Sequence, residues 1–198
     1  ISLLENAIAT TYQDSTLLYN ELGSKYEEIG NFDKAEAAYK RAIELNPLES
    51  MSYSSLGDLL ANKLYRYKEA EFYYRKAIEL TPDFGTAYNN LGILLKTLER
   101  YDEAEDVYRK AIRLNPMEAA SYSNLGNLLT ENLKRYEEAE AAYCTAIDID
   151  PHYSAAHHNL GILLAILGRY DEAEAAYRKA IELGPIDNDV YLALGNLL

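Results

Sequence analysis

The sequence predicts an all-α fold built from a row of stacked helix pairs. Two short signals recur along its 198 residues. The pair Leu-Gly occurs at Leu22-Gly23, Leu56-Gly57, Leu91-Gly92, Leu125-Gly126, Leu160-Gly161 and Leu194-Gly195. Proline occurs at Pro47, Pro82, Pro116, Pro151 and Pro185, so successive prolines are 35, 34, 35 and 34 residues apart. Self-similarity at a fixed period of this size indicates a repeat array, in which each unit buries its apolar surface against its neighbours.

Each copy is expected to contain two helices. In residues 85–118 the apolar residues fall at helical spacing in two blocks, Tyr88, Leu91 and Leu95 and then Ala104, Tyr108 and Ile112. The glycine of Leu-Gly lies inside the first block, where it costs about 1 kcal/mol relative to alanine, so we interpret it as a close-packing point. The proline ends the second helix, because the residue before a proline disfavours the α region.

Five complete copies follow one another along the chain. We place them at residues 16–49, 50–84, 85–118, 119–153 and 154–187. Residues 1–15 are expected to form the second helix of a degenerate preceding repeat or an N-terminal cap, and residues 188–198 the first helix of a truncated sixth repeat. Copies two and four carry one extra residue between their helices, in Ala61–Tyr67 and Thr130–Tyr136, which indicates a duplicated 69-residue double repeat.

The order of an aromatic residue, Leu-Gly, Ala, Tyr, Ala and Pro in every copy resembles the tetratricopeptide repeat family. The resemblance covers residues 16–187, although the chain lacks the tryptophan that usually occupies the family's first position. It implies a right-handed superhelical solenoid of antiparallel helix pairs. It also implies that the first helices line a concave groove that holds an extended peptide or a helix of a partner protein.

Composition excludes several classes of partner. The chain has 32 acidic and 19 basic residues, a formal net charge of −13, and no basic stripe. Since affinity for nucleic acids comes largely from Lys and Arg contacts to phosphates, we expect no nucleic-acid ligand, and the acidic balance favours a basic protein partner. No apolar run reaches the roughly 18–20 residues that span a bilayer, so no membrane partner is expected. The single Cys144 favours a reducing compartment, and we expect a cytoplasmic location.

No pattern of catalytic residues accompanies the repeats. The sequence contains no glycine-rich phosphate loop and no supported nucleophile motif, so we expect neither an enzyme nor a cofactor. His152 and His158 with Asp148 or Asp150 form the only candidate metal set, and packed or surface imidazoles are the alternative interpretation. Glu and Arg or Lys four residues apart on second helices, such as Glu105 and Arg109, are expected to pair in solvent.

The candidate binding residues follow from the resemblance, which places positions one, two and five residues after the repeat aromatic in the groove. The second of these positions holds Asn90, Asn124 and Asn159 in three successive copies. An amide offers two donors and an acceptor, so this asparagine ladder is expected to bind the backbone of an extended peptide. The alternative is that these asparagines bond to neighbouring helices. The other candidates are Ser55, Asp58, Asn89, Ile93, Lys96, Asn127, His158 and Ile162.

These patterns predict a non-catalytic scaffold for protein–protein interaction. Chaperone-binding members of the family hold a C-terminal carboxylate with lysines at set groove positions, but this chain has Asn20, Thr86, Ala120 and Ala155 there, so a chaperone tail is not the expected ligand. One alternative is a structural module that associates head to tail through its unpaired end helices. Another is the substrate-recognition arm of a larger enzyme.

Overall fold

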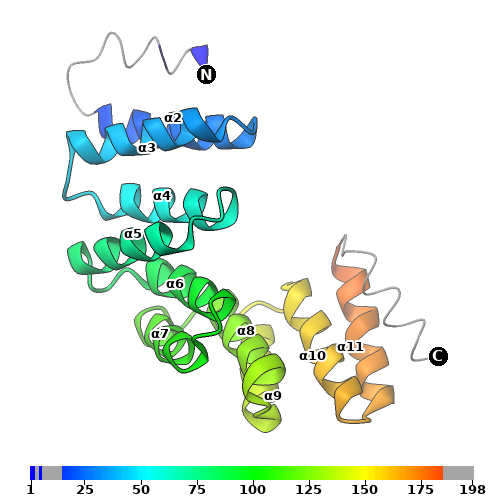
Figure 1. The fold of residues 1–198 in the computed structure, drawn as a ribbon. Coiled ribbons are helices and arrows are strands. Elements are labelled where there is room, and N and C mark those ends of the chain that lie inside the picture. The colour runs from blue at the N-terminus through cyan, green and yellow to red at the C-terminus, as the bar shows by residue number, and fades with distance from the viewer. Residues whose placement is uncertain (3–4, 6–14, 185–198) are drawn as a thin grey trace. The chain divides into compact units, whose positions relative to one another are not determined.

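The computed structural model describes residues 1–2, 5 and 15–184, and within them it contains helices and turns but no strand. The first helices of the repeats are α2 (Ser15–Glu28), α4 (Ser50–Asn62), α6 (Gly85–Thr97), α8 (Ala119–Leu128) with the π-helical turn η1 (Leu129–Leu133), and α10 (Ser154–Ile166). The second helices are α3 (Phe32–Leu45), α5 (Tyr67–Leu80), α7 (Tyr101–Leu114), α9 (Tyr136–Ile149) and α11 (Tyr170–Leu183). Figure 1 shows this alternation, which confirms the predicted all-α array of helix pairs.

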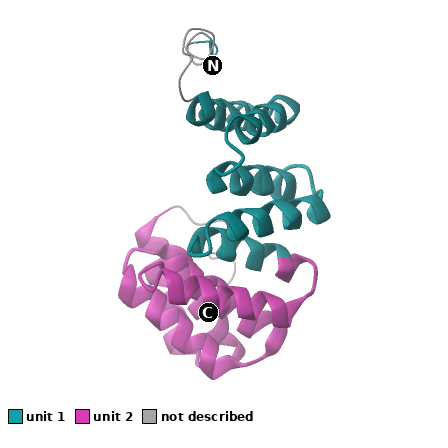
Figure 2. Ribbon diagram, turned by 90° about the vertical axis from the view of Figure 1, so that its left-hand side faces the viewer, with its two compact units in different colours: residues 1–94 teal, residues 95–198 magenta. Residues whose placement is uncertain are grey.

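The chain divides into two compact units, residues 1–94 and residues 95–198 (Figure 2). In the first unit α2 packs on α3, α3 on α4, and α4 on α5. In the second unit α7 packs on α8, α8 on α9, α9 on α10, and α10 on α11. Within each unit these helices contact both their partner in the repeat and a helix of the adjacent repeat.

In four repeats a tyrosine of the second helix packs directly against the Leu-Gly glycine of the first helix, in the pairs Gly23–Tyr39, Gly57–Tyr74, Gly126–Tyr143 and Gly161–Tyr177. A Cβ atom added at Gly57 would lie 2.8 Å from the ring of Tyr74, and one added at Gly126 would lie 2.6 Å from the ring of Tyr143. Both rings are almost completely buried, with 2% and 1% exposed. The interpretation of this glycine as a close-packing point is therefore confirmed.

The turns between the two helices of a repeat share one backbone feature, a residue in the left-handed region. These residues are Gly30 (φ 73°), Tyr65 (φ 55°), Glu99 (φ 59°), Lys134 (φ 56°) and Gly168 (φ 74°). A left-handed residue after a helix satisfies carbonyl groups that would otherwise lack a partner, and it reverses the chain direction.

The extra residue of copies two and four is accommodated by widening the last turn of the first helix. In copy four this turn is the π-helical segment η1. In copy two the amide of Leu64 donates to the carbonyl of Leu59 at 3.2 Å, a bond that spans five residues instead of four. A π-type turn holds one more residue than an α-turn, so the insertion stays within one turn of helix.

The predicted end helices, over residues 1–15 and 188–198, lie almost entirely outside the described residues, and so does the start of the sixth repeat. The structure therefore does not test head-to-tail packing of these ends. Over the ranges that the structure describes, no helix combines the length and the apolar composition needed to cross a bilayer.

Candidate functional site

In the second unit, three residues predicted to bind a ligand line one hollow on the first helices. This hollow has a volume of about 180 Å³. Its walls come from α8, η1 and the turn that follows, α10, and one second-helix tyrosine. They consist of Asn127, Thr130, Glu131, Lys134, Tyr143, Asn159, Ile162 and Ile166. Asn127, Asn159 and Ile162 therefore lie close together in the structure.

A buried phenol fixes the amide of Asn127 in this hollow. The hydroxyl of Tyr143 donates to Oδ1 of Asn127 at 2.8 Å and lies 3.2 Å from the hydroxyl oxygen of Thr130. Burial raises the pKa of the Tyr143 phenol to about 12, so the phenol remains a donor at neutral pH. Oδ1 of Asn127 already accepts the bond from Tyr143. The N–H groups of the same amide therefore remain to donate to a carbonyl of a ligand.

The same hollow has a charged edge and an apolar edge. Nζ of Lys96, another predicted residue, lies 2.7 Å from Oε2 of Glu131. On α10, Ile162 is 37% exposed and Ile166 is 54% exposed. The sequence analysis missed Ile166, although its place four residues after Ile162 on the same helix was a usable signal. Two exposed isoleucines beside two fixed amides can bind an apolar side chain of a peptide together with its backbone.

In the first unit the predicted residue Asp58 lies at the centre of a hydrogen-bond cluster. Its Oδ1 accepts from the hydroxyl of Tyr74 at 2.7 Å and from Nδ2 of Asn90 at 2.8 Å. Burial raises the pKa of the Asp58 carboxyl to about 6, the two hydrogen bonds oppose this shift, and the charge of Glu27 adds to it. Asp58 is therefore a half-buried anion that carries most, but not all, of its charge at neutral pH.

Two ladder asparagines donate to a neighbouring first helix. Asn90 of α6 reaches Asp58 of α4, and Nδ2 of Asn159 of α10 lies 3.4 Å from the hydroxyl oxygen of Ser123 of α8. These bonds agree with the interpretation that the asparagines link neighbouring helices. Each bond uses one of the two N–H groups of an amide, so they do not exclude contact with a peptide.

The remaining candidates differ in how accessible they are. Ile93 is 41% exposed, and Ser55 and Asn124 are partly buried. His158 is partly buried as well, with its ring centroid 5.9 Å from that of Tyr177. Asn89 differs from all the others because it is only 7% exposed, which leaves it almost no free surface for a ligand. It directly precedes Asn90, and neighbouring positions on a helix point about 100° apart.

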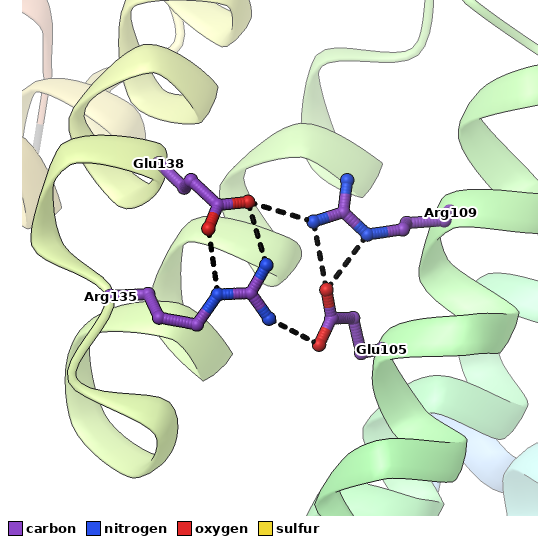
Figure 3. Close-up of polar contacts among 4 residues, drawn as sticks. All are labelled: Glu105, Arg109, Arg135 and Glu138. Atoms are coloured by element: carbon purple, nitrogen blue, oxygen red, sulfur yellow. Dashed lines mark hydrogen bonds and ion pairs between the residues drawn. The ribbon is translucent and has the colours of Figure 1, made fainter.

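A network of arginines and glutamates joins successive second helices, and the sequence analysis missed it. In Figure 3 the guanidinium of Arg135 binds both carboxylate oxygens of Glu138, at 2.7 Å each, and Oε2 of Glu105 on α7 at 2.7 Å. Arg109 lies 2.8 Å from Oε1 of Glu105, the expected pair, and 3.0 Å from Glu138. Only 15% of the Glu105 side chain is exposed.

The same arrangement recurs one double repeat earlier and one repeat later. Arg66 bridges Glu69 of its own helix and Glu36 of α3 at 2.6 and 2.7 Å. Arg169 bridges Glu172 and Glu140 of α9, both at 2.7 Å. Because these arginines stand at the N-cap position of a second helix, each one ties the start of that helix to the preceding repeat. We interpret the network as structural support and not as a binding site.

The candidate metal set does not converge. Across the parts of the chain that the structure describes, no three His, Cys, Asp or Glu side chains are arranged to hold a metal ion. Cys144 is exposed on α9 as a free thiol. Partial burial, and then the nearby Glu140 and Asp148, raise the pKa of this thiol, which disfavours the reactive thiolate.

Comparison with known proteins agrees with the array of helix pairs seen in the structure. Models of the tetratricopeptide repeat match residues 17–47, 51–84, 85–117 and 117–185. No curated protein matches the chain. The crystal structure of MamA is similar with 27% identity and a TM-score of 0.69, over 81% of this chain and 93% of that one.

Two further solved structures share the fold. YrrB, described as a TPR protein with an unusual peptide-binding site, is 24% identical with a TM-score of 0.66, over 98% of this chain and 97% of that one. PilF of Pseudomonas aeruginosa is 22% identical with a TM-score of 0.82, over 93% of this chain and 83% of that one. Proteins of this kind generally act as non-catalytic scaffolds that bind other proteins. The chain belongs to the tetratricopeptide repeat family.

Proposed function

We propose that this chain is a non-catalytic scaffold that binds a segment of another protein along its first helices. The observation that carries the proposal is the hollow lined by Asn127, Asn159 and Ile162, where amides and exposed apolar side chains lie together. Binding sites for peptides commonly combine apolar surface with a few fixed polar groups. The peptide-binding site described for YrrB supports a similar use of the fold here.

The polar groups favour an extended segment. The amides of Asn90, Asn124 and Asn159 return once per repeat, and an amide can donate to a carbonyl and accept from an N–H of the same peptide. A row of this kind would bind backbone groups and give little side-chain selectivity. Selectivity would come from Ile162 and Ile166, which favour an apolar side chain.

The charges favour a partner with basic residues. The carboxylate of Asp58 is partly buried, and its two hydrogen-bond donors, Tyr74 and Asn90, are both uncharged. Buried charges are stabilised when an opposite charge pairs with them, so a Lys or Arg of the ligand would be favoured near Asp58. The formal net charge of −13 would also speed the approach of a basic partner.

The test is selection from a random-peptide display library, followed by fluorescence anisotropy with the enriched peptides. The variants are Ile162→Ser and the set Asn90→Ala, Asn124→Ala and Asn159→Ala. Met117→Ser is the matched control, because Met117 is 71% exposed in a turn and does not line the hollow. Circular dichroism establishes first that each variant is folded.

The proposal predicts enriched peptides that bind the native chain and Met117→Ser equally. We expect Ile162→Ser and the triple asparagine variant to bind at least tenfold more weakly. Equal binding by all variants would refute the proposed site. Loss of binding with Ile162→Ser alone would place the ligand in the hollow and assign the asparagines to helix packing.

A further inference from the structure

A second and larger hollow lies in the second unit between α7, α8 and α9, away from the candidate residues. Its volume is about 370 Å³. Ile112, Tyr122, Leu125 and Leu129 form an apolar wall, and Ala141 and Ala142 of α9 form a flat one. The polar residues of its lining are Arg109, Arg113, Glu138 and Thr145. The carboxylate of Glu138 is already paired with Arg109 and Arg135. None of these residues belongs to the hollow on the first helices.

The duplicated 69-residue repeat shows which kind of side chain fits beside Tyr122. Subtracting 69 from the residue numbers relates Tyr122 to Tyr53, and Ala142 to Tyr73, in the first unit. There the ring of Tyr73 lies 6.2 Å from the ring of Tyr53, centroid to centroid, with the planes tilted by 43°. The chain thus places an aromatic ring beside this tyrosine in one unit. In the other unit alanine stands at that position, next to a hollow.

The charge beside the hollow also differs between the units. Arg113 is exposed, and no ion pair is found for it among the residues that the structure describes. Its equivalent in the first unit is Glu44, which pairs with Arg41 at 2.8 Å. Arg109, by contrast, is already paired with Glu105 and Glu138. The guanidinium of Arg113 is thus available to pair with a carboxylate of a ligand that enters this hollow.

The next repeat provides an internal contrast. An equivalent hollow of about 470 Å³ is lined by His157, Leu160, Leu164 and Ala176 in place of Tyr122, Leu125, Leu129 and Ala142. In this hollow Cys144 and Asp148 replace Arg109 and Arg113. It therefore lacks the tyrosine ring and the two arginines, and its one cation, Lys179, is paired with Glu182 at 3.0 Å. Of these two hollows, the one between α7, α8 and α9 combines a tyrosine wall with an available cation.

We propose that the hollow between α7, α8 and α9 binds a tyrosine or phenylalanine side chain of a partner protein, from a segment in which an acidic residue adjoins the aromatic one. The ring takes the place beside Tyr122 that Tyr73 takes beside Tyr53, in a tilted arrangement that aromatic pairs favour. The adjoining carboxylate pairs with Arg113. This contact is separate from the site on the first helices, so the chain can hold two segments.

The experiment measures binding of fluorescein-labelled peptides to the full chain. The acidic aromatic peptide is Gly-Ser-Glu-Tyr-Glu-Ser-Gly, and the comparison peptides carry Ala in place of Tyr or Lys in place of both Glu. Ala142→Tyr fills the hollow with the side chain that the first unit carries at the equivalent position, and circular dichroism establishes that the variant is folded. Ala176→Tyr makes the same change in the next hollow and is the matched control.

The native chain and Ala176→Tyr are expected to bind the acidic tyrosine peptide at least tenfold more tightly than either comparison peptide. Ala142→Tyr is expected to lose this binding. Arg113→Glu, which introduces the residue of the first unit, is expected to weaken it about three- to tenfold, as for the loss of a partly exposed ion pair. It should also reduce the discrimination against the lysine peptide.

Four outcomes would overturn the proposal. They are no saturable binding by the native chain, equal binding by Ala142→Tyr, equal loss with Ala176→Tyr, and self-association that depends on Ala142 in sedimentation velocity. The last outcome would mean that a second copy fills the hollow. Ile162→Ser, the test variant of the first site, is expected to bind this peptide as the native chain does, so failure of one site is distinguishable from failure of the other.

Discussion

The hydroxyl of Tyr74 donates a 2.7 Å hydrogen bond to the carboxylate of Asp58 from a ring that is 2% exposed. The equivalent phenol, Tyr143, donates to Asn127 at 2.8 Å. In the first unit the buried tyrosine hydroxyl thus donates to the carboxylate of Asp58, and in the second unit it donates to the neutral amide of Asn127. The charge on Asp58 affects the stability of the chain as well as recognition.

The first prediction concerns pH. The pKa of Asp58 is raised from an ordinary value of 3.8 to about 6. Between about pH 4 and pH 6 the folded chain therefore retains a proton that the unfolded chain has released, so the free energy of unfolding falls as pH rises through this window. The loss is about 3 kcal/mol at most, since one unit of pKa corresponds to about 1.4 kcal/mol.

Asp58→Asn is expected to remove this pH dependence and to stabilise the chain at pH 8 but not at pH 4. Asn127→Asp is the reciprocal control, and it should introduce a loss of stability at pH 8. Urea unfolding followed by circular dichroism at both pH values measures the differences. The same slope with pH in the native chain and in Asp58→Asn would contradict the prediction.

The second prediction concerns the left-handed turn residues of the second unit. Glu99 and Gly168 have φ angles of 59° and 74°. A left-handed conformation costs a residue with a side chain roughly 1–2 kcal/mol, and glycine adopts it without this cost. Glu99→Gly should therefore stabilise the chain by about 1 kcal/mol, and Gly168→Ala should destabilise it by a similar amount. Thermal unfolding measures both, and a loss of stability in Glu99→Gly would be inconsistent with this account.

The third prediction concerns the arginine network. In a double-mutant cycle, Arg135→Ala and Glu105→Ala are expected to show a coupling of about 1 kcal/mol, because the Glu105 side chain is only 15% exposed. The pair of Lys179 and Glu182, with side chains 43% and 69% exposed, is the control and should show a coupling close to zero. The first coupling should shrink in 1 M NaCl. A coupling no larger than that of the control pair would reject a structural role for the network.

The fourth prediction concerns the close contact of Gly126 and Tyr143. The added methyl group of Gly126→Ala would lie 2.6 Å from the buried ring, and overpacking of this kind costs typically 1–3 kcal/mol. Because alanine favours helix by about 1 kcal/mol, the net loss of stability should be about 0–2 kcal/mol. In a Tyr143→Leu background the same change should be neutral or stabilising. Thermal unfolding is measured for the native chain, Gly126→Ala, Tyr143→Leu and the double variant. If the effects of the two substitutions on stability were additive, the predicted contact would be refuted.

The sequence predicted the helix pairs because each pair is specified by residues within one period of about 34. The close packing at the Leu-Gly glycine, seen for Gly57 and Tyr74, follows from the same register. The grouping of Asn127, Asn159 and Ile162 in one hollow was not predicted from the sequence. The bond from Arg135 to Glu105 was not predicted, because it joins residues 30 positions apart whose rotamers depend on packing between repeats. The hollow beside Ala142 was missed for a related reason, since it arises from a side chain that is small.

The burial of Asn89 shows a second limit of sequence reasoning. Asn89 and Asn90 are the same residue type at adjacent positions, and both were expected to reach a ligand. The structure leaves Asn89 7% exposed and directs Asn90 to Asp58. Repeat register gives a residue's position along the helix, but its rotation about the helix axis decides whether its side chain is accessible.

The widened turn Leu129–Leu133 has a consequence for how such a chain can change in length. Glycine and tyrosine are 17 residues apart in the pair Gly126 and Tyr143, and 16 apart in the pair Gly161 and Tyr177, yet an added Cβ would lie 2.6 Å from the ring in both. A residue inserted at this turn therefore does not change the contact between the glycine and the tyrosine in the core. Copies with and without the extra residue can replace one another, so recombination between copies of unequal length would still give a chain whose repeats stack.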